Sequence, residues 1–166
     1  MGCIVMSNKV RTGIAALALS AAGLLGITNS EGFTEKAVVP VPGDIPTYGY
    51  GSTRKADGSP VRMGDTITRQ QAAELVNKDA GRFAAAIKRC VTVPLTQGEF
   101  DAYVSLTYNI GAGAFCKSTL VKRLNAGDYA GACAEIKRWD KMGGKVLRGL
   151  TARREREYQM CVSQSK

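Results

Sequence analysis

Three carboxylates, Glu31, Glu35 and Asp44, lie in the stretch SEGFTEKAVVPVPGDIPTYGYGST, residues 30–53, together with the hydroxyl of Thr47. Cleavage of a glycosidic bond needs one protonated carboxyl group for the leaving oxygen and a second group that handles water or the oxocarbenium charge. Glu31 follows an apolar segment and is the better candidate for the acid, whereas Asp44 lies in a polar turn and is expected to be the second, ionised carboxylate. The hydroxyl of Thr47 could hold the water. The alternative is structural: Glu31 ends a helix, Asp44 holds a turn and Thr47 lies in a strand.

The sequence contains no histidine, which excludes Ser-His and Cys-His nucleophilic catalysis. The cysteines form no C-x-x-C pair, so no zinc motif is present. We predict neither a metal nor a cofactor. In an oxidising compartment, four body cysteines would form two disulfides and leave Cys3 unpaired; buried free thiols in a cytosolic protein are the alternative. Three pairings are possible. We expect Cys90 with Cys116, flanking the central helix, and Cys133 with Cys161, joining the last two helical segments.

The chain is basic, with 23 Lys and Arg against 14 Asp and Glu in 166 residues, a net charge of +9. This charge favours a polyanionic partner such as nucleic acid, anionic lipid or the bacterial envelope. The basic residues are not interleaved with aromatic ones, and no nucleic-acid-binding motif is present. We therefore predict no nucleic acid partner. The length suits one domain with its own core.

An uncharged, Ala- and Gly-rich run covers residues 12–28, after Lys9 and Arg11. A basic start followed by an apolar stretch is typical of an export signal. The run is close to the short limit for a membrane-spanning helix, about 20 apolar residues, so it would be a weak anchor. A signal peptide removed near ALSA, residues 18–21, is one alternative, and a buried helix of a cytosolic protein is another.

The body combines a short turn-and-strand segment with several helices. Residues 53–65 are rich in turn signals and should form a loop or a short hairpin. Two capping boxes, Thr68 with Gln71 and Thr96 with Glu99, predict helices that begin just after each threonine. Further helices are predicted over 118–125, 128–140 and 149–161. The predicted fold class is α+β, with a small N-terminal hairpin lobe and a mainly helical C-terminal lobe, and the arginines of the last helix should face solvent.

Five segments occur in an order that resembles the phage-type lysozymes, the endolysins of glycoside hydrolase family 24, and in particular the signal-anchor-release type. They are SEG (30–32), PTYGYGST (46–53), YNIGAGAFCKSTL (108–120), LNAGDYAGACAEIKRWD (124–140) and GLTARREREYQMC (149–161). Together they cover most of the body. The resemblance implies a lysozyme-like fold and cleavage of the β-1,4 bond between N-acetylmuramic acid and N-acetylglucosamine in peptidoglycan, with an inverting course.

The family's catalytic set implied by the resemblance is a Glu, then an Asp after eight residues, then a Thr after five more. Glu31 and Thr47 match it directly. The Asp does not, because the ninth position after Glu31 is Pro40 and the hairpin has gained a residue. Asp44 is the only Asp of the hairpin and is assigned to the second role, with Glu35 as the alternative. The missing spacing leaves open a catalytically degenerate module that binds peptidoglycan, and the leader leaves open a membrane-active protein.

The same resemblance predicts residues 1–28 as an export signal and weak anchor, followed by a catalytic domain over 29–166. The predicted partners are peptidoglycan glycan strands and, through residues 12–28, the inner membrane of a bacterial host; the enzyme should be a monomer. The family's catalytic Glu ends a short helix that packs on the body. An inserted segment would deny Glu31 that helix, so the protein tethered in the periplasm should be inactive until release.

Overall fold

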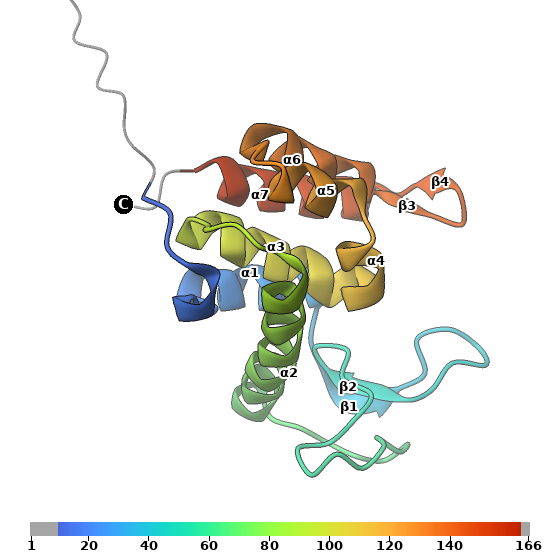
Figure 1. The fold of residues 1–166 in the computed structure, drawn as a ribbon. Helices are drawn as coiled ribbons and strands as arrows, with labels where there is room; N and C mark the ends of the chain where they lie inside the picture. The colour runs from blue at the N-terminus through green and yellow to red at the C-terminus, as the bar shows by residue number, and fades with distance from the viewer. Residues whose placement is uncertain (1–9, 164–166) are drawn as a thin grey trace, which may run out of the picture.

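The computed structural model describes residues 10–163, which form the predicted α+β fold (Figure 1). An N-terminal arm, residues 10–20, contains a short 3₁₀ helix, η1 (Ile14–Ala16). The next elements along the chain are α1 (Ala21–Glu31), β1 (Thr34–Val38), β2 (Thr47–Gly49), α2 (Arg69–Cys90) and α3 (Gln97–Ile110). The remaining elements are α4 (Ala112–Cys116), α5 (Thr119–Asn125), α6 (Tyr129–Glu135), η2 (Ile136–Arg138), β3 (Lys141–Met142), β4 (Lys145–Val146) and α7 (Arg148–Val162).

The two long helices begin where their capping boxes predict. The side chain of Thr68 accepts a hydrogen bond from the backbone of Gln71, and the Gln71 side chain accepts one from the backbone of Thr68. Thr96 and Glu99 make the same reciprocal pair at the start of α3. Each box satisfies two backbone donors that the first turn of a helix leaves without partners.

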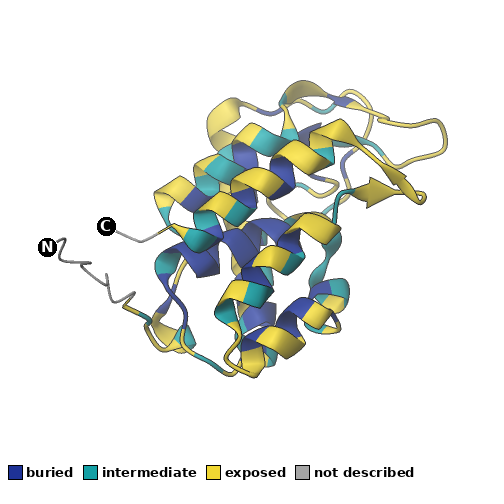
Figure 2. Ribbon diagram, turned by 90° about the horizontal axis from the view of Figure 1, so that it is seen from above, coloured by how far each residue is buried: buried dark blue, intermediate teal, exposed yellow. Residues whose placement is uncertain are grey.

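Helix α3 is the centre of the helical lobe. Every residue from Gly98 to Thr107 is buried, and Figure 2 shows the buried faces of the neighbouring helices turned toward the interior. Phe100, Tyr103 and Leu106 have no exposed surface and pack with residues of α1, α2 and α7. A helix buried on all sides can position the helices around it, because each of them packs against the same rigid element.

The hairpin lobe has a small core of its own. Strands β1 and β2 pair antiparallel, with Thr34 opposite Gly49 and Val38 opposite Thr47, and an irregularity between these pairs. The loop 39–46 joins the strands. Buried side chains from the hairpin, from the loop before α2 and from α2 itself form the core: Ala37, Tyr48, Val61, Ile67, Ala72 and Leu75. The turn-rich segment 53–65 is an irregular loop, as predicted, with one bridge between Arg54 and Pro60.

Both predicted disulfides are present. Cys90 pairs with Cys116, with the two Cα atoms 5.7 Å apart, and Cys133 pairs with Cys161 at 5.8 Å. The first links the end of α2 to α4, and the second links α6 to α7. Cys3 lies outside the described residues.

A short helix and a hairpin were not predicted from the sequence. Helix α4 is only one turn long. Strands β3 and β4 form a two-residue hairpin that projects from the helical lobe (Figure 1). Its turn residues, Gly143 and Gly144, have φ values of 57° and 81°, the left-handed region that glycine adopts without strain.

The apolar N-terminal run is part of the folded body in this structure. Helix α1 contains residues from both sides of the predicted boundary between residues 28 and 29, and it buries Gly23, Ile27 and Thr28. Within residues 10–163, no helix is long and apolar enough to cross a membrane.

Candidate active site

Glu31 is the last residue of α1 and stands at the junction between the two lobes. The next residue, Gly32, ends the helix with φ 65°, a backbone conformation that residues other than glycine rarely adopt. The chain then continues through Phe33 into β1. The Glu31 side chain is 21% exposed, and its Oε1 accepts a hydrogen bond of 2.5 Å from Nη1 of Arg153 on α7. The family resemblance predicted this place at a helix end. The guanidinium partner was not predicted.

Arg153 belongs to a buried charge cluster on the inner face of α7. Its Nε donates to Oε1 of Glu157 at 3.2 Å, and its side chain is 6% exposed. Arg154 pairs with the other oxygen of Glu157 at 2.9 Å, and the Ser105 hydroxyl of α3 donates to Oε1 at 2.7 Å. The prediction that the arginines of this helix face solvent is therefore wrong for Arg153 and Arg154. Two guanidinium groups and two carboxylates compensate one another inside the lobe.

The buried position shifts the proton affinities of this cluster. Burial raises the pKa of Glu157 above its usual value, although the adjacent Arg154 acts in the opposite direction. Burial also lowers the pKa of Arg154 to about 10, against the attraction of Glu157. Loss of hydration disfavours the charged form of each group, and the attraction between Arg154 and Glu157 offsets only part of this desolvation cost. The cluster is thus held by its geometry, and removing one member would leave a buried charge.

The other predicted residues lie in the hairpin lobe. Thr47 is half-buried and opens β2. Asp44 is exposed in the loop before it, where its backbone N–H donates to the Val41 carbonyl at 2.9 Å. Pro40, at the family's usual Asp position, is an exposed residue of the same loop. The alternative, Glu35, points out of β1 as an exposed side chain. The hairpin thus brings Asp44 and Thr47 into one segment, and only Gly32 and Phe33 separate Glu31 from β1.

A hollow of about 400 Å³ lies between the hairpin lobe and helices α2 and α3. Its lining includes Ser52, whose buried hydroxyl has no hydrogen-bond partner among the described residues, and the contacting rings of Phe83 and Tyr108. Burial, followed by the negative charges of Asp79 and Glu31, raises the pKa of Tyr108. Ser52 and Tyr108 lie in two of the segments that carry the family resemblance, but the sequence alone gave them no role.

A family model described as "Phage lysozyme" matches residues 28–157, most of the chain. The chain belongs to the phage lysozyme family. An endolysin of Bacillus phage B103 is 40% identical over 146 residues, which cover 87% of this phage lysozyme and 54% of the relative. This chain therefore spans about half the length of that relative. The resemblance to the phage-type lysozymes inferred from the five segments is confirmed.

Two further proteins similar to this phage lysozyme match over nearly their full length. The protein named SAR-endolysin of Enterobacteria phage P21 is 33% identical over 149 residues, covering 89% of this chain and 88% of the relative. The solved structure "Endolysin from Escherichia coli O157:H7 phage FAHEc1" aligns with a TM-score of 0.81 and 38% identity, covering 94% and 98% of the two chains. The lysozyme-like α+β fold predicted from the sequence is thus confirmed.

Proposed function

We propose that this phage lysozyme is an endolysin that hydrolyses the β-1,4 bond between N-acetylmuramic acid and N-acetylglucosamine in peptidoglycan and so lyses a bacterial host. The observation that carries the proposal is the position of Glu31, held by a buried guanidinium where α1 passes into the hairpin. A general acid must be held rigidly beside the bond that it protonates. The end of a packed helix provides such a support, whereas a flexible loop does not.

In this proposal Glu31 donates a proton to the leaving oxygen. Among the contacts within residues 10–163, Arg153 engages Oε1 of Glu31, so Oε2 is the atom assigned to carry the proton. The guanidinium fixes the orientation of the carboxyl group and stabilises the carboxylate that remains after donation. Asp44 is assigned to the second carboxylate role and Thr47 to holding the attacking water, the arrangement of an inverting glycosidase.

The decisive experiment measures muropeptides released from purified peptidoglycan by mass spectrometry. Wild-type protein should release fragments cut at the muramic acid bond, and Glu31→Gln should release almost none while keeping the wild-type fold. Glu155→Gln, on the exposed face of α7, is the matched control and should retain activity. More than a few per cent of activity in Glu31→Gln would place the acid elsewhere.

The second carboxylate is tested by comparing two variants of the hairpin lobe. Asp44→Asn should lower kcat by a factor on the order of 100, within the range that acid–base groups contribute, and Glu35→Gln should have a mild effect. The reverse ranking would transfer the role to Glu35. Binding of peptidoglycan without any cleavage would instead support the degenerate module, which the proline at the usual Asp position favours.

We further propose that the chain is exported to the periplasm, with residues 1–28 serving as an export signal and weak anchor ahead of a catalytic region over 29–166. The basic residues before an uncharged run support this, as does the similarity to a protein named SAR-endolysin. While residues 12–28 are in the bilayer, α1 cannot form on the body, so the tethered protein is inactive. Active enzyme whose N-terminus, by mass, begins at Ala21 or later would reveal a cleaved signal peptide and refute the release step.

A further inference from the structure

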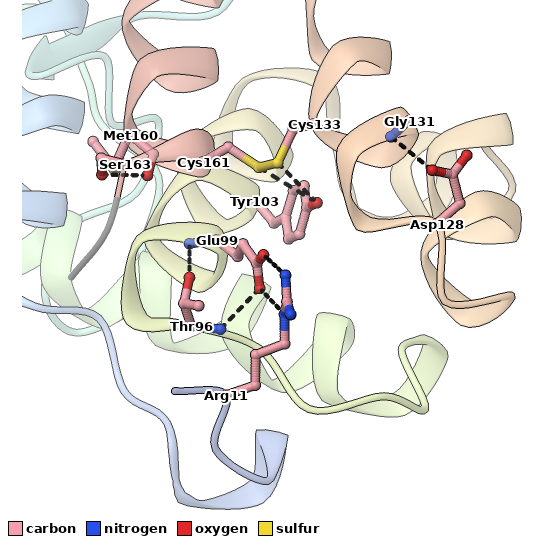
Figure 3. The surroundings of a disulfide bond; sticks show 10 residues. All are labelled: Arg11, Thr96, Glu99, Tyr103, Asp128, Gly131, Cys133, Met160, Cys161 and Ser163. Atoms are coloured by element: carbon pink, nitrogen blue, oxygen red, sulfur yellow. Dashed lines mark hydrogen bonds and ion pairs between the residues drawn. A yellow bond between two sulfur atoms is a disulfide. The ribbon is translucent and has the colours of Figure 1, made fainter. Parts of the chain in front are cut away.

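The N-terminal arm, residues 10–20, is fastened to the start of α3 and the segment before it. Thr12 and Leu95 exchange backbone hydrogen bonds of 2.8 and 3.0 Å. Nη2 of Arg11 donates to the buried Glu99 carboxylate at 2.8 Å, as Figure 3 shows, and its guanidinium stacks 3.5 Å from the centre of the Tyr129 ring. The arm therefore reaches α1 along a fixed path.

At the end of this arm, the side chain of Asp101 accepts hydrogen bonds from Ser20, the N-cap residue of α1. Asp101 lies on α3 and is 3% exposed. Its Oδ1 accepts a hydrogen bond from the backbone N–H of Ser20 at 3.0 Å and another from Nε2 of Gln97 at 2.9 Å, and its Oδ2 accepts one from the Ser20 hydroxyl. Ser20 is also the N-cap of α1, where its oxygen accepts from the N–H of Gly23 at 3.1 Å. One buried carboxylate is thus joined to the origin of the helix.

The backbone of α1 approaches Asp101 so closely that no side chain fits between them. A Cβ atom at Gly23 would lie 2.8 Å from Cγ and 2.9 Å from Oδ1 of Asp101, closer than Cβ atoms pack in proteins. This contact does not depend on the hydrogen bonds of Ser20, yet it involves the same carboxylate. Asp101 therefore fixes both the N-cap of the helix, Ser20, and the separation between α1 and α3.

We propose that Asp101 is a positioning residue for Glu31: it sets the position of α1 at its N-terminal end, and the helix carries that position to its last residue. The proposal rests on the proposed role of Glu31 as the acid. Helix α1 is 11 residues long, about 16 Å at 1.5 Å per residue. Ile27, with no exposed surface, packs midway along the helix, so a shift at one end is transmitted as movement of a rigid body.

The test uses four variants of the full chain. The Asp101 carboxylate accepts three hydrogen bonds, two from Ser20 and one from Gln97. In Asp101→Asn, one of its two oxygens becomes an NH₂ group, which donates and cannot accept. Ser20→Gly removes the hydroxyl but keeps most of the capping preference, whereas Ser20→Thr retains both hydroxyl functions. Ser118→Gly is the matched control, because Ser118 is likewise a serine N-cap, of α5, with no contact to α1 or Asp101 among its hydrogen bonds.

Two measurements are needed: kcat and KM on peptidoglycan chains, and amide hydrogen exchange along α1. We expect Asp101→Asn and Ser20→Gly to lower kcat by a factor of about 10 to 100, since displacement of a reacting group by about 1 Å costs that much. KM should change less than about twofold, and exchange in α1 should accelerate, because glycan contacts remain while the helix loosens. Ser20→Thr should restore kcat. The double variant should lose no more than the worse single variant, because both remove the same contact.

Three outcomes would overturn the proposal: a kcat no lower in Asp101→Asn than in Ser118→Gly, an effect confined to KM, or faster exchange in α1 with unchanged kcat. None of these depends on the identity of the acid. If Glu31→Gln is active while Asp101→Asn still accelerates exchange in α1, the proposed acid fails and Asp101 is only a structural residue of the helix. The two failures are therefore distinguishable.

Discussion

Replacing Gly23 by alanine places two opposing effects on one helix. Alanine is a better helix former than glycine by about 1 kcal/mol. However, its Cβ would meet Cγ of Asp101 at 2.8 Å and Cδ1 of Leu19 at 2.6 Å. To lengthen the distance between this Cβ and Cγ of Asp101 from 2.8 Å to an ordinary contact of 3.4 Å, α1 must move by roughly 0.6 Å. Forced repacking of this kind costs about 1–3 kcal/mol. We expect a net loss of roughly 0–2 kcal/mol in stability and a fall in kcat of about tenfold.

Gly26→Ala is the matched control on the same helix. Its Cβ would meet only Cε of Met160, at 3.2 Å, and this end of a flexible side chain can move aside. Gly26→Ala should therefore be as stable as wild type or about 0.5–1 kcal/mol more stable, with unchanged kcat. Thermal unfolding resolves such differences, since 1 kcal/mol corresponds to a Tm shift of about 2–4 °C in a domain of this size. Equal Tm and equal kcat in the two variants would refute the reasoning.

Three other predictions concern α7, the disulfides and the leader. Arg153→Met should destabilise the protein by about 3 kcal/mol in urea unfolding, because it removes the guanidinium that pairs with Glu31 and one of the two that pair with the buried Glu157; a cost below about 1 kcal/mol would contradict this. Replacing Cys133 and Cys161 by alanine opens a loop with a sequence separation of 28 and should cost about 3.5 kcal/mol; a Tm equal to that of the oxidised wild type would be inconsistent with the bond. Ala21→Leu with Ala22→Leu, both exposed in α1, should raise the membrane-bound fraction and delay lysis without disturbing the packing. Unchanged fractionation would argue against tethering.

The choice of positions for the leader test comes from the structure. Leucines at Gly23 and Gly26 would also make the segment more apolar, and the sequence offers them as obvious sites. In the folded protein, however, Gly23 contacts Asp101, so a leucine there would impair the enzyme directly. Delayed lysis in that variant would have two explanations, whereas exposed positions on the same helix leave only one.

The sequence predicted the elements whose signals are local. The boxes at Thr68 and Thr96 defined the starts of α2 and α3 because capping depends on residues three positions apart. Strands β3 and β4 were missed because two residues cannot show an alternating pattern, although Gly143 and Gly144 carried a turn signal.

The parts of the site that depend on distant residues could not be predicted. Arg153 and Glu31 are 122 positions apart in the chain, and an arginine-rich helix face reads as solvent-exposed until its carboxylate partners are known. Asp101 likewise reads as an ordinary polar residue of a helix. The place of Glu31 at a helix end followed from the family resemblance. The second carboxylate stays a prediction because the loop 39–46 has no regular pattern that fixes its side chains.

The two disulfides cross-link only the C-terminal half of the chain and leave α1 and the hairpin outside their covalent loops. Both cross-links join residues between Cys90 and Cys161. Among the described residues, everything before Cys90, including α1 and the hairpin, therefore lies outside every closed covalent ring. Helix α1 can leave the body and return without threading a loop or breaking a sulfur–sulfur bond. The two disulfides therefore place no covalent barrier between an undocked α1 and its position on the body.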